Sequence, residues 1–375
     1  MMRIVFDATS LARELTGIEN YTKNLVINLI SKLRPDDELF VLVRKQIPEY
    51  LQKSNNVQII ICPLDSQLFC EQVWIPIVHR KIKPDVIHFP AFPPPLLVKK
   101  NIYFTVHDAT MWKYPETLSL KNKLYMRPLS EYGIKKAKKV LTVSEYSKKE
   151  LVEVFPKLSE KIENMGISIS SEIRKVRDIK KLEDVKKRYK LPFRFLLSVG
   201  SLEPRKNLLF LIKSFTKFCL ETNQKDLKLV ITGRSAWGAT DILSYIKMNN
   251  MEDQIIMTGY VPDDDLMSLY SLCDFFVFPS IYEGFGLPVL EAMACGSSVI
   301  VSNSSSIPEV AGDAAVYFNP HDEESLINVL KKVYNNSEIQ RELKYKGKKR
   351  VTKFSWDKIS GNIYALYGKA RENNE

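Results

Sequence analysis

The stretch Ser280–Gly296, which reads SIYEGFGLPVLEAMACG, decides how the rest of the chain is interpreted. It follows the apolar run Phe275–Phe278, which is typical of a buried parallel strand. Two glycines form the loop, and Pro288 opens a helical pattern that Gly296 closes. Because a helix N-terminus presents free backbone N–H groups, this arrangement favours an anion or a polar ligand at the loop.

Two carboxylates frame the loop. Glu283 precedes the helix, and Glu291 is expected in its first turn. Carboxylates suit a phosphate poorly, but they accept hydrogen bonds from sugar hydroxyls well. The alternative makes Glu283 a simple loop residue and Glu291 a residue that complements the helix dipole. A glycine-rich turn by itself does not decide between the two.

The full spelling from residue 283 to 294, E-G-F-G-L-P-x-x-E-A-M-A, resembles the Glu-x7-Glu signature of the retaining glycosyltransferases of family 4. The resemblance implies an α/β fold of the GT-B class. In that fold two Rossmann-like domains face each other across a cleft, and a C-terminal helix returns to the N-terminal domain. It also implies an enzyme, a hexosyltransferase that uses a nucleotide sugar as its donor.

The composition agrees with a chain of two globular domains. The 375 residues are 45% hydrophobic and 26% charged, without low-complexity segments. From residue 159 to 190 the sequence becomes highly charged and loses strand character, and a strand pattern restarts at Phe195. We therefore expect an acceptor-binding domain at residues 1–188, joined by about 357–375, and a nucleotide-sugar-binding domain at 189–356.

The formal net charge is +11, for which three explanations stay open: a lysine-rich composition, an anionic substrate and an anionic membrane surface. No nucleic-acid-binding motif is present. The five scattered cysteines contain no C-x-x-C pair, so neither a zinc site nor a disulfide framework is expected. No apolar run of 18 residues and no signal-peptide pattern is found, which predicts a cytoplasmic protein, with peripheral attachment to the inner face of the cell membrane as an option.

The N-terminal half alternates strand-like and helical segments, which indicates a parallel sheet covered on both faces. Gly17 lies between the first strand, Ile4–Asp7, and a helix, and the resemblance places it near the donor diphosphate. His107 and Asp108 follow a later strand. By resemblance His107 contacts the donor sugar, while Asp108 orients the imidazole or contacts the acceptor; His88 is a weaker acceptor candidate.

A mixed basic and aromatic segment runs from Trp112 through Lys121, Lys123 and Arg127 to Lys139. It predicts either a solvated helix face or a surface for anionic lipid head groups that carry a lipid-linked acceptor.

The second half opens with Phe195–Val199 and then Gly200-Ser-Leu-Glu-Pro-Arg-Lys-Asn207. Arg205 and Lys206, on a loop after a strand, suit a diphosphate. An isolated Arg-Lys pair is usually surface charge, but the string E-P-R-K-N resembles the phosphate-binding loop of the family. The resemblance also assigns the donor site a set of neighbouring residues: Gly200, Gly233, Arg234, Tyr260, Val261, Gly284, Phe285, Gly286 and Leu287.

Three adjacent aspartates, Asp263–Asp265, invite a metal site, but their position before Leu266 and Leu269 favours a helix N-terminus. No metal is expected. Residues 165–168 replace the Asn-Gly-Val-Asp turn of many family members, so that turn is given no donor contact.

The resemblance implies that Glu291 holds the nucleotide ribose, that Glu283 holds a sugar hydroxyl, and that Arg205 and Lys206 stabilise the departing diphosphate without a metal or other cofactor. The expected reaction moves a hexose, with GDP-mannose as the first donor, onto a glycan or lipid-linked acceptor in bacterial surface polysaccharide synthesis. Other UDP- or dTDP-sugar donors, a GT-B sugar-nucleotide 2-epimerase and an inactive nucleotide-sugar-binding partner subunit remain alternatives. Acceptor, linkage and oligomeric state stay open.

Overall fold

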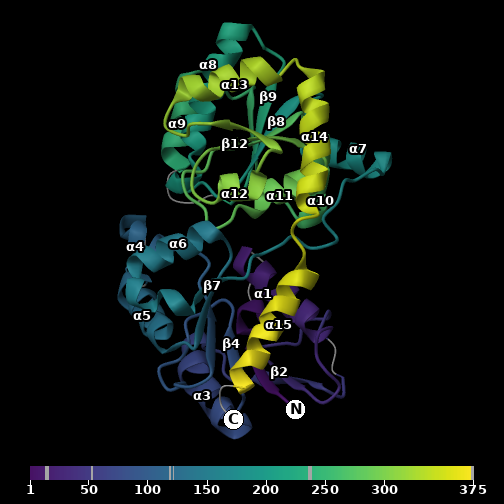
Figure 1. The fold of residues 1–375 in the computed structure, drawn as a ribbon. Helices are drawn as coiled ribbons and strands as arrows, with labels where there is room; N and C mark the ends of the chain where they lie inside the picture. The colour runs from purple at the N-terminus through teal and green to yellow at the C-terminus, as the bar shows by residue number, and fades with distance from the viewer. Residues whose placement is uncertain (13–16, 52–53, 118–119, 121, 235–238, 373–375) are drawn as a thin grey trace. The chain divides into compact units, whose positions relative to one another are not determined.

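A computed structural model describes residues 1–372 except 13–16, 52–53, 118–119, 121 and 235–238. The chain forms two compact units (Figure 1). The first comprises Met1–Ser168 and Ser355–Glu375, and the second comprises Ile169–Phe354.

The N-terminal unit contains a seven-stranded, wholly parallel sheet in the order β3-β2-β1-β4-β5-β6-β7. Its strands are β1 (Arg3–Asp7), β2 (Glu38–Arg44), β3 (Val57–Cys62), β4 (Val86–Phe89), β5 (Ile102–Thr105), β6 (Lys139–Thr142) and β7 (Ile162–Asn164). Strands β4 and β5 are buried along their whole length and β1 is buried except at Arg3, as expected for a parallel sheet covered on both faces.

Helices cover both faces of this sheet. They are α1 (Gly17–Ile30), α2 (Gln67–Phe69), α3 (Ile75–Ile82), α4 (Thr110–Lys113), α5 (Arg127–Lys136), α6 (Glu145–Val154) and α15 (Trp356–Glu372). One face packs against Ile75, Ile134 and Leu151 of α3, α5 and α6. On the other face α15 lies beside α1 (Figure 1), and the buried Tyr103 of β5 meets Tyr367 of α15 with ring centres 5.1 Å apart. The expected return of the C-terminal helix to the N-terminal unit is confirmed.

The C-terminal unit contains a six-stranded parallel sheet in the order β10-β9-β8-β11-β12-β13. Its strands are β8 (Phe195–Val199), β9 (Lys228–Thr232), β10 (Ile255–Gly259), β11 (Phe275–Phe278), β12 (Ser298–Ser302) and β13 (Ala315–Phe318). Its helices are α7 (Ile179–Arg188), α8 (Leu208–Thr222), α9 (Ala239–Met248), α10 (Asp263–Leu272), α11 (Leu287–Ala294), α12 (Ile307–Ala311), α13 (Glu323–Val333) and α14 (Ser337–Val351).

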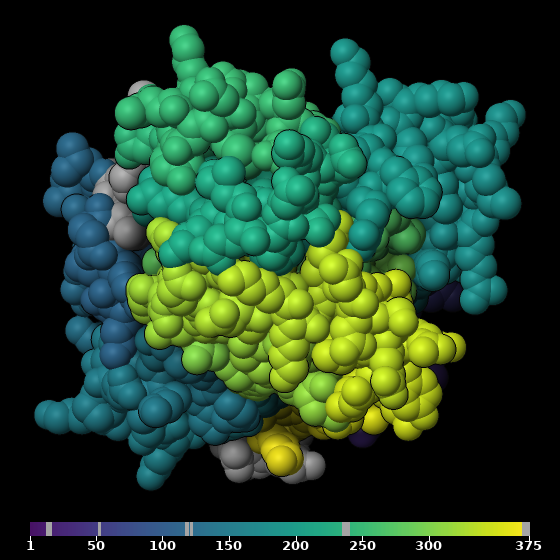
Figure 2. Space-filling model, turned by 90° about the horizontal axis from the view of Figure 1, so that it is seen from above, coloured from purple at the N-terminus to yellow at the C-terminus, as the bar shows by residue number. Residues whose placement is uncertain are grey.

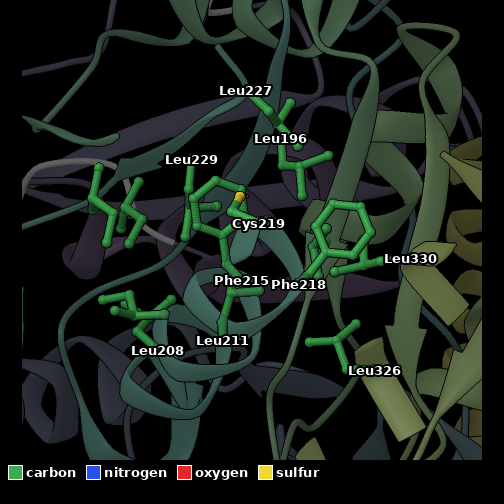
Figure 3. Packing of buried hydrophobic residues seen from close by; sticks show 14 of the residues in the cluster. Leu196, Leu208, Leu211, Phe215, Phe218, Cys219, Leu227, Leu229, Leu326 and Leu330 are labelled. Carbon is green, nitrogen blue, oxygen red and sulfur yellow. The ribbon is translucent and has the colours of Figure 1, made fainter. Parts of the chain in front are cut away.

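The core of this unit lies between the sheet and the paired helices α8 and α13, which show on the unit's surface in Figure 2. Phe215 and Phe218 of α8 point inward with Leu326 and Leu330 of α13 (Figure 3). All four side chains are buried, and burial of large apolar side chains contributes about 1.5–3 kcal/mol each. This packing fixes the strand ends that carry the site described below.

The boundary between the units lies about twenty residues before the expected position near residue 188. The reason is α7, which packs on α10 rather than on the N-terminal sheet. Arg188 donates to the Asp265 carboxylate, and Tyr189 donates to the same oxygen at 2.9 Å. Most of the highly charged segment, residues 169–190, therefore belongs to the second unit.

The three-residue strand β7 lies within the segment in which we expected no strand. It pairs only with β6, through Ile162 opposite Val140, and only Ile162 of the three residues is buried. A short edge strand of this kind shows no apolar run in the sequence. Of the helices that the structure describes, none is long and apolar enough to cross a membrane.

Candidate active site

The candidate site begins where the strand order of the C-terminal sheet reverses. Strands β8 and β11 are neighbours there, with β9 beyond one and β12 beyond the other. Loops that leave adjacent strands in opposite directions at such a point open a crevice at the carboxyl ends of the strands, where ligands bind in sheets of this type. The two loops are the segment after β8 that holds Arg205 and Lys206, and the segment after β11 that holds Glu283.

The loop after β8 folds into a 3-10 turn, Pro204–Lys206. Asn207 ends the turn in the left-handed conformation, with φ 57°, and its side chain donates to the carbonyl of Pro320 at 2.8 Å. The carbonyl of Arg205 accepts from the backbone N–H of Ile281 at 2.8 Å, which ties the loop after β8 to the loop after β11. This backbone contact sets both cations opposite Glu283.

Glu283 forms ion pairs with both cations. Its two carboxylate oxygens accept from Lys206 Nζ at 2.6 Å and from the Arg205 guanidinium at 3.1 Å. The Lys206 and Glu283 side chains are only 12% and 10% exposed. Arg205 is also paired with Glu203, at 2.9 Å. The site thus brings two cations and two carboxylates into contact at the carboxyl ends of β8 and β11.

Burial and charge act in opposite directions on this pair. Burial alone would raise the pKa of Glu283, but the charges of Lys206 and Arg205 hold that pKa below its usual value. Burial lowers the pKa of Lys206, and the Glu283 carboxylate offsets this only in part. The two cations thus favour the ionised form of Glu283 in spite of its burial. An anionic ligand that replaced the carboxylate would find Lys206 already largely dehydrated.

Close backbone packing holds the loop after β8 against the end of β9. The N–H of Gly200 donates to the carbonyl of Thr232, and the N–H of Gly233 donates to the carbonyl of Gly259, each at 2.9 Å. A Cβ built on Gly233 would lie 2.0 Å from the carbonyl oxygen of Gly200. Glycine is therefore required at Gly233 by the approach of two main chains.

We expect Gly233→Ala to lower the free energy of unfolding by about 2–4 kcal/mol, because one of the two main chains must move away. Urea denaturation measures the change. Gly361→Ala is the matched control, since no atom lies within 4 Å of its added Cβ and alanine favours a helix by about 0.5–1 kcal/mol. Equal stability of Gly233→Ala and the wild type would contradict the close approach.

The glycine loop after β11 is held by a row of serines. The hydroxyl of Ser306 donates to the carbonyl oxygens of Glu283 and Phe285, both at 2.9 Å, and Ser305 Oγ accepts from the N–H of Glu283 at 3.0 Å. Gly286 has φ 104° and immediately precedes α11. These serines belong to the run SNSSS at residues 302–306, which directly precedes α12.

Helix α11 begins at Leu287, which corrects the expected position of Glu291. Glu291 lies in the second turn rather than the first, so it does not complement the helix N-terminus. Instead its carboxylate accepts from the hydroxyl of Tyr270 at 3.1 Å. Burial raises the pKa of Glu291 to about 7, although the Tyr270 hydrogen bond opposes the shift.

A raised pKa in the folded state reduces stability as the pH rises. Below pH about 4.5 both the folded and the unfolded chain hold the Glu291 proton, and above pH about 7 both have lost it. As the pH rises between these two values, the free energy of unfolding falls, and it keeps the lower value at still higher pH. We expect Glu291→Gln to raise the free energy of unfolding by about 1–3 kcal/mol at pH 8 and to leave it unchanged at pH 4. Denaturation curves of both proteins at the two pH values test this, and a constant difference would contradict it.

Arg234 and Tyr260 form a separate contact at the ends of β9 and β10. The guanidinium carbon of Arg234 lies 4.9 Å from the Tyr260 ring centre, and the ring is 58% exposed. Val261, in contrast, is buried. An exposed aromatic ring beside a cation at a strand end offers a flat surface to a nucleotide base, whereas Val261 can contribute only through its backbone.

In the N-terminal unit, His107 lies two residues after β5 and is half-buried. Its Nε2 lies 2.8 Å from the carbonyl of Pro90, which can only accept, so Nε2 carries the proton and Nδ1 the lone pair. The ring packs edge-on against Tyr21 at 4.9 Å. Burial lowers the pKa of His107, against the opposing effects of Pro90 and Asp108, and the imidazole is neutral at pH 7.

Of the other candidates in this unit, only His88 conflicts with its expected role. His88 is fully buried, and its two ring nitrogens contact Tyr367 and, at 2.8 Å, Thr105. It is a core residue that an acceptor cannot reach. Asp108 accepts from the backbone N–H of Thr110 at 2.8 Å, so it shapes the turn after His107. Gly17 is exposed and begins α1, and an added Cβ there meets no atom within 4 Å.

Asp263–Asp265 form the first turn of α10, so the prediction of a helix N-terminus at these aspartates is confirmed. Within the described parts of the chain, no group of three or more His, Cys, Asp or Glu side chains is arranged to hold a metal ion.

Comparison with known proteins shows which family the chain resembles. Residues 180–350 match the glycosyl transferases group 1, and residues 16–163 match Glycosyltransferase Family 4. The chain is 30% identical to the O-antigen chain mannosyltransferase B of Escherichia coli, over 98% of this chain and 99% of that protein. It is 34% identical to the serotype-specific mannosyltransferase WbdA of Escherichia coli over 62% of this chain, but it spans only 29% of the length of that relative.

Solved structures agree on the fold. The sucrose-phosphate synthase of Thermosynechococcus elongatus aligns over all of both chains with a TM-score of 0.73 at 20% identity. WaaG, a glycosyltransferase involved in lipopolysaccharide biosynthesis, aligns over 97% of this chain and 99% of its own with a TM-score of 0.71 at 13% identity. Anabaena HepE in complex with UDP and glucose aligns over 98% of this chain and 100% of its own with a TM-score of 0.70 at 15% identity. The chain therefore belongs to the glycosyltransferases of family 4 and has their GT-B fold of two Rossmann-like units.

Proposed function

We propose that this glycosyltransferase moves mannose from GDP-mannose, with retention of configuration, onto a glycan or lipid-linked acceptor in bacterial surface polysaccharide synthesis in the cytoplasm. The observation that carries the proposal is a pair of cations, the largely buried Lys206 and the half-buried Arg205, held on Glu283 where the strand order of the C-terminal sheet reverses. A nucleoside diphosphate supplies the two negative charges that such a pair suits.

The proposed chemistry uses charge stabilisation rather than a protein nucleophile. As the sugar–phosphate bond breaks, negative charge grows on the diphosphate, and Arg205 and Lys206 lie ready to stabilise it. The leaving phosphate then takes the proton of the acceptor hydroxyl as the new bond forms on the same face of the sugar. Neither a metal ion nor another cofactor takes part in this scheme.

The remaining residues would position the donor. The Glu283 carboxylate would accept from a sugar hydroxyl, and Glu291, one turn into α11, would accept from the ribose. The Gly284–Gly286 backbone would contact the sugar and phosphate, with Gly200 and Gly233 allowing close approach. Neutral His107 of the N-terminal unit would contact the donor sugar.

Mannose is supported by the relatives, two of which are named as O-antigen or serotype-specific mannosyltransferases. The base is less constrained, since HepE was solved with UDP and glucose and shares the fold. The exposed Tyr260 beside Arg234 offers stacking to any base.

A thermal-shift series with GDP, UDP, dTDP and ADP, and with their sugar conjugates, tests the donor. The ligand that binds the folded state raises the melting temperature. We expect a shift with GDP and GDP-mannose that persists in EDTA. A shift with UDP or dTDP alone would show that the donor is a UDP- or dTDP-sugar instead of GDP-mannose. Loss of the shift in EDTA would overturn the metal-free scheme. Incubation of the responding sugar nucleotide without acceptor reveals a 2-epimerase by a new sugar, and NMR of a transferred product gives the anomeric configuration.

A further inference from the structure

An exposed apolar ridge lies on the N-terminal unit, away from the strand ends. The helical stretch from α2 through the π-helical turn Cys70–Trp74 into α3 buries Cys70, Ile75 and Val78 against the sheet side. Its outer side is also apolar. Phe69, Val73 and Ile77 follow one another at intervals of four residues and are 58%, 45% and 57% exposed.

Neighbouring segments widen this ridge. Gln72 connects them, since its side-chain oxygen accepts from the backbone N–H of Leu96 at 3.2 Å and its nitrogen lies 3.3 Å from the hydroxyl of Tyr125. Leu96, Leu97 and Leu124 are 50%, 56% and 77% exposed. We define the apolar ridge as these seven residues together: Leu68, Phe69, Val73, Ile77, Leu96, Leu97 and Leu124. Singly exposed leucines are ordinary, but a joined set of this kind marks an interaction surface.

The charge around the ridge is almost wholly positive. Residues 66–83, 92–101 and 120–128 together contain eight Lys and Arg residues and one acidic residue, Glu71, which is buried. Arg80, Lys81 and Lys83 extend from α3 and are exposed, and Lys100 lies beside α3 because its backbone hydrogen-bonds to His79. An apolar strip with basic residues along its edge is the pattern of helices that lie in the interface of anionic bilayers.

The contacts also separate the ridge from the basic and aromatic segment identified in the sequence. Trp112 is turned inward, with its ring 5.3 Å from Phe155 and its indole N–H on Glu131. Lys113 is paired with Glu153 at 2.7 Å, and Lys121 lies outside the described residues. Of that segment, Lys123 and Leu124 lie at the ridge, so the ridge is a different surface from most of the segment.

We propose that the apolar ridge inserts into the interface of an anionic lipid bilayer, with Arg80, Lys81, Lys83, Lys99, Lys100 and Lys123 contacting the head groups. Charge complementarity favours a membrane over a protein partner or a second copy of this basic chain. The helical stretch is too short to span a bilayer but suits a helix lying flat in its surface. The inference rests on these contacts and not on the donor or acceptor proposed above.

Co-sedimentation with vesicles tests the ridge on the full chain. Vesicles of phosphatidylcholine alone are compared with vesicles that contain 30% phosphatidylglycerol. We expect binding to the anionic vesicles, and a loss of at least tenfold in Phe69→Gln/Ile77→Gln. The control is Leu220→Gln/Met248→Gln, which replaces two still more exposed apolar residues (77% and 81%) on the C-terminal unit and should bind as the wild type does. Unchanged melting temperatures and an unchanged nucleotide-induced shift show that the variants are folded.

A second variant tests the charge. Arg80→Gln/Lys81→Gln/Lys83→Gln should weaken binding to anionic vesicles by at least tenfold and leave the slight binding to neutral vesicles unchanged, because each basic residue near an anionic surface contributes about 1 kcal/mol. High salt should reproduce this loss. Absence of wild-type binding, or equal binding by all variants, would overturn the proposal. A concentration-dependent dimer in sedimentation velocity that Phe69→Gln/Ile77→Gln abolishes would assign the ridge to a second copy instead.

Discussion

Replacing Lys206 by methionine is expected to lower kcat/KM for sugar transfer by about 10²–10³, the usual cost of removing one preorganised charge from a leaving group. Methionine has a similar length and keeps the packing over Phe278, whose ring centre lies 5.4 Å from Lys206 Nζ. Glu283 retains the Arg205 guanidinium as a partner. The loss should therefore appear in catalysis and in nucleotide affinity, with the fold preserved.

The control for this variant is Lys331→Met, which removes an exposed lysine paired with Glu221 at 2.6 Å. Such surface pairs contribute about 0–1 kcal/mol, so both activity and melting temperature should stay close to those of the wild type. Steady-state kinetics with the donor identified by thermal shift measures the comparison. If Lys206→Met retained more than half of the wild-type kcat/KM, the assignment of the diphosphate to this loop would be wrong.

Glu283→Gln should have the second large effect, on stability and catalysis together. The change removes the carboxylate shared by Lys206 and the half-buried Arg205, and breaking a largely buried ion pair in this way costs about 3–5 kcal/mol. Turnover should fall by about 10² or more, since the proposed sugar contact loses its charge. The melting temperature and kcat give the two readouts.

Nucleotide binding separates these two roles of Glu283. The carboxylate occupies the cations that the diphosphate is proposed to use, so GDP should stabilise Glu283→Gln by at least as many degrees as it stabilises the wild type. A purely structural glutamate, remote from the ligand, would give a variant with lower stability, a normal kcat when folded and an unaltered response to GDP. That combination of results would refute the proposed sugar contact.

The sequence predicted much of this fold because apolar strands and glycine turns recur along it. Phe275–Phe278 is a strand within its expected limits, and α1 begins at Gly17 as expected. The comparisons confirmed the family that E-G-F-G-L-P-x-x-E indicated. The motif could place Glu283 beside a sugar-binding loop, but its partners come from a loop 77 residues earlier in the chain, and only the sheet order brings them together.

The errors have similar physical causes. The domain boundary was placed late because a charged helix such as α7 shows no sign of which sheet it belongs to, and the Arg188–Asp265 contact decides this in three dimensions. His88 lies near the carboxyl end of an apolar strand, as a ligand-binding residue would, yet its ring is enclosed by Thr105 and by Tyr367, 279 residues away. Apolar side chains on the outside of α3 could not be told from core residues by their spacing.

A crystal structure of the chain with GDP would show where the diphosphate binds. We expect diphosphate oxygens about 3 Å from Lys206 Nζ and from the Arg205 guanidinium. We also expect that the α11 backbone lies next to the same group and that Glu291 is within hydrogen-bond distance of the ribose. A diphosphate bound elsewhere, with Arg205 and Lys206 still paired only with carboxylates, would contradict this placement of the diphosphate.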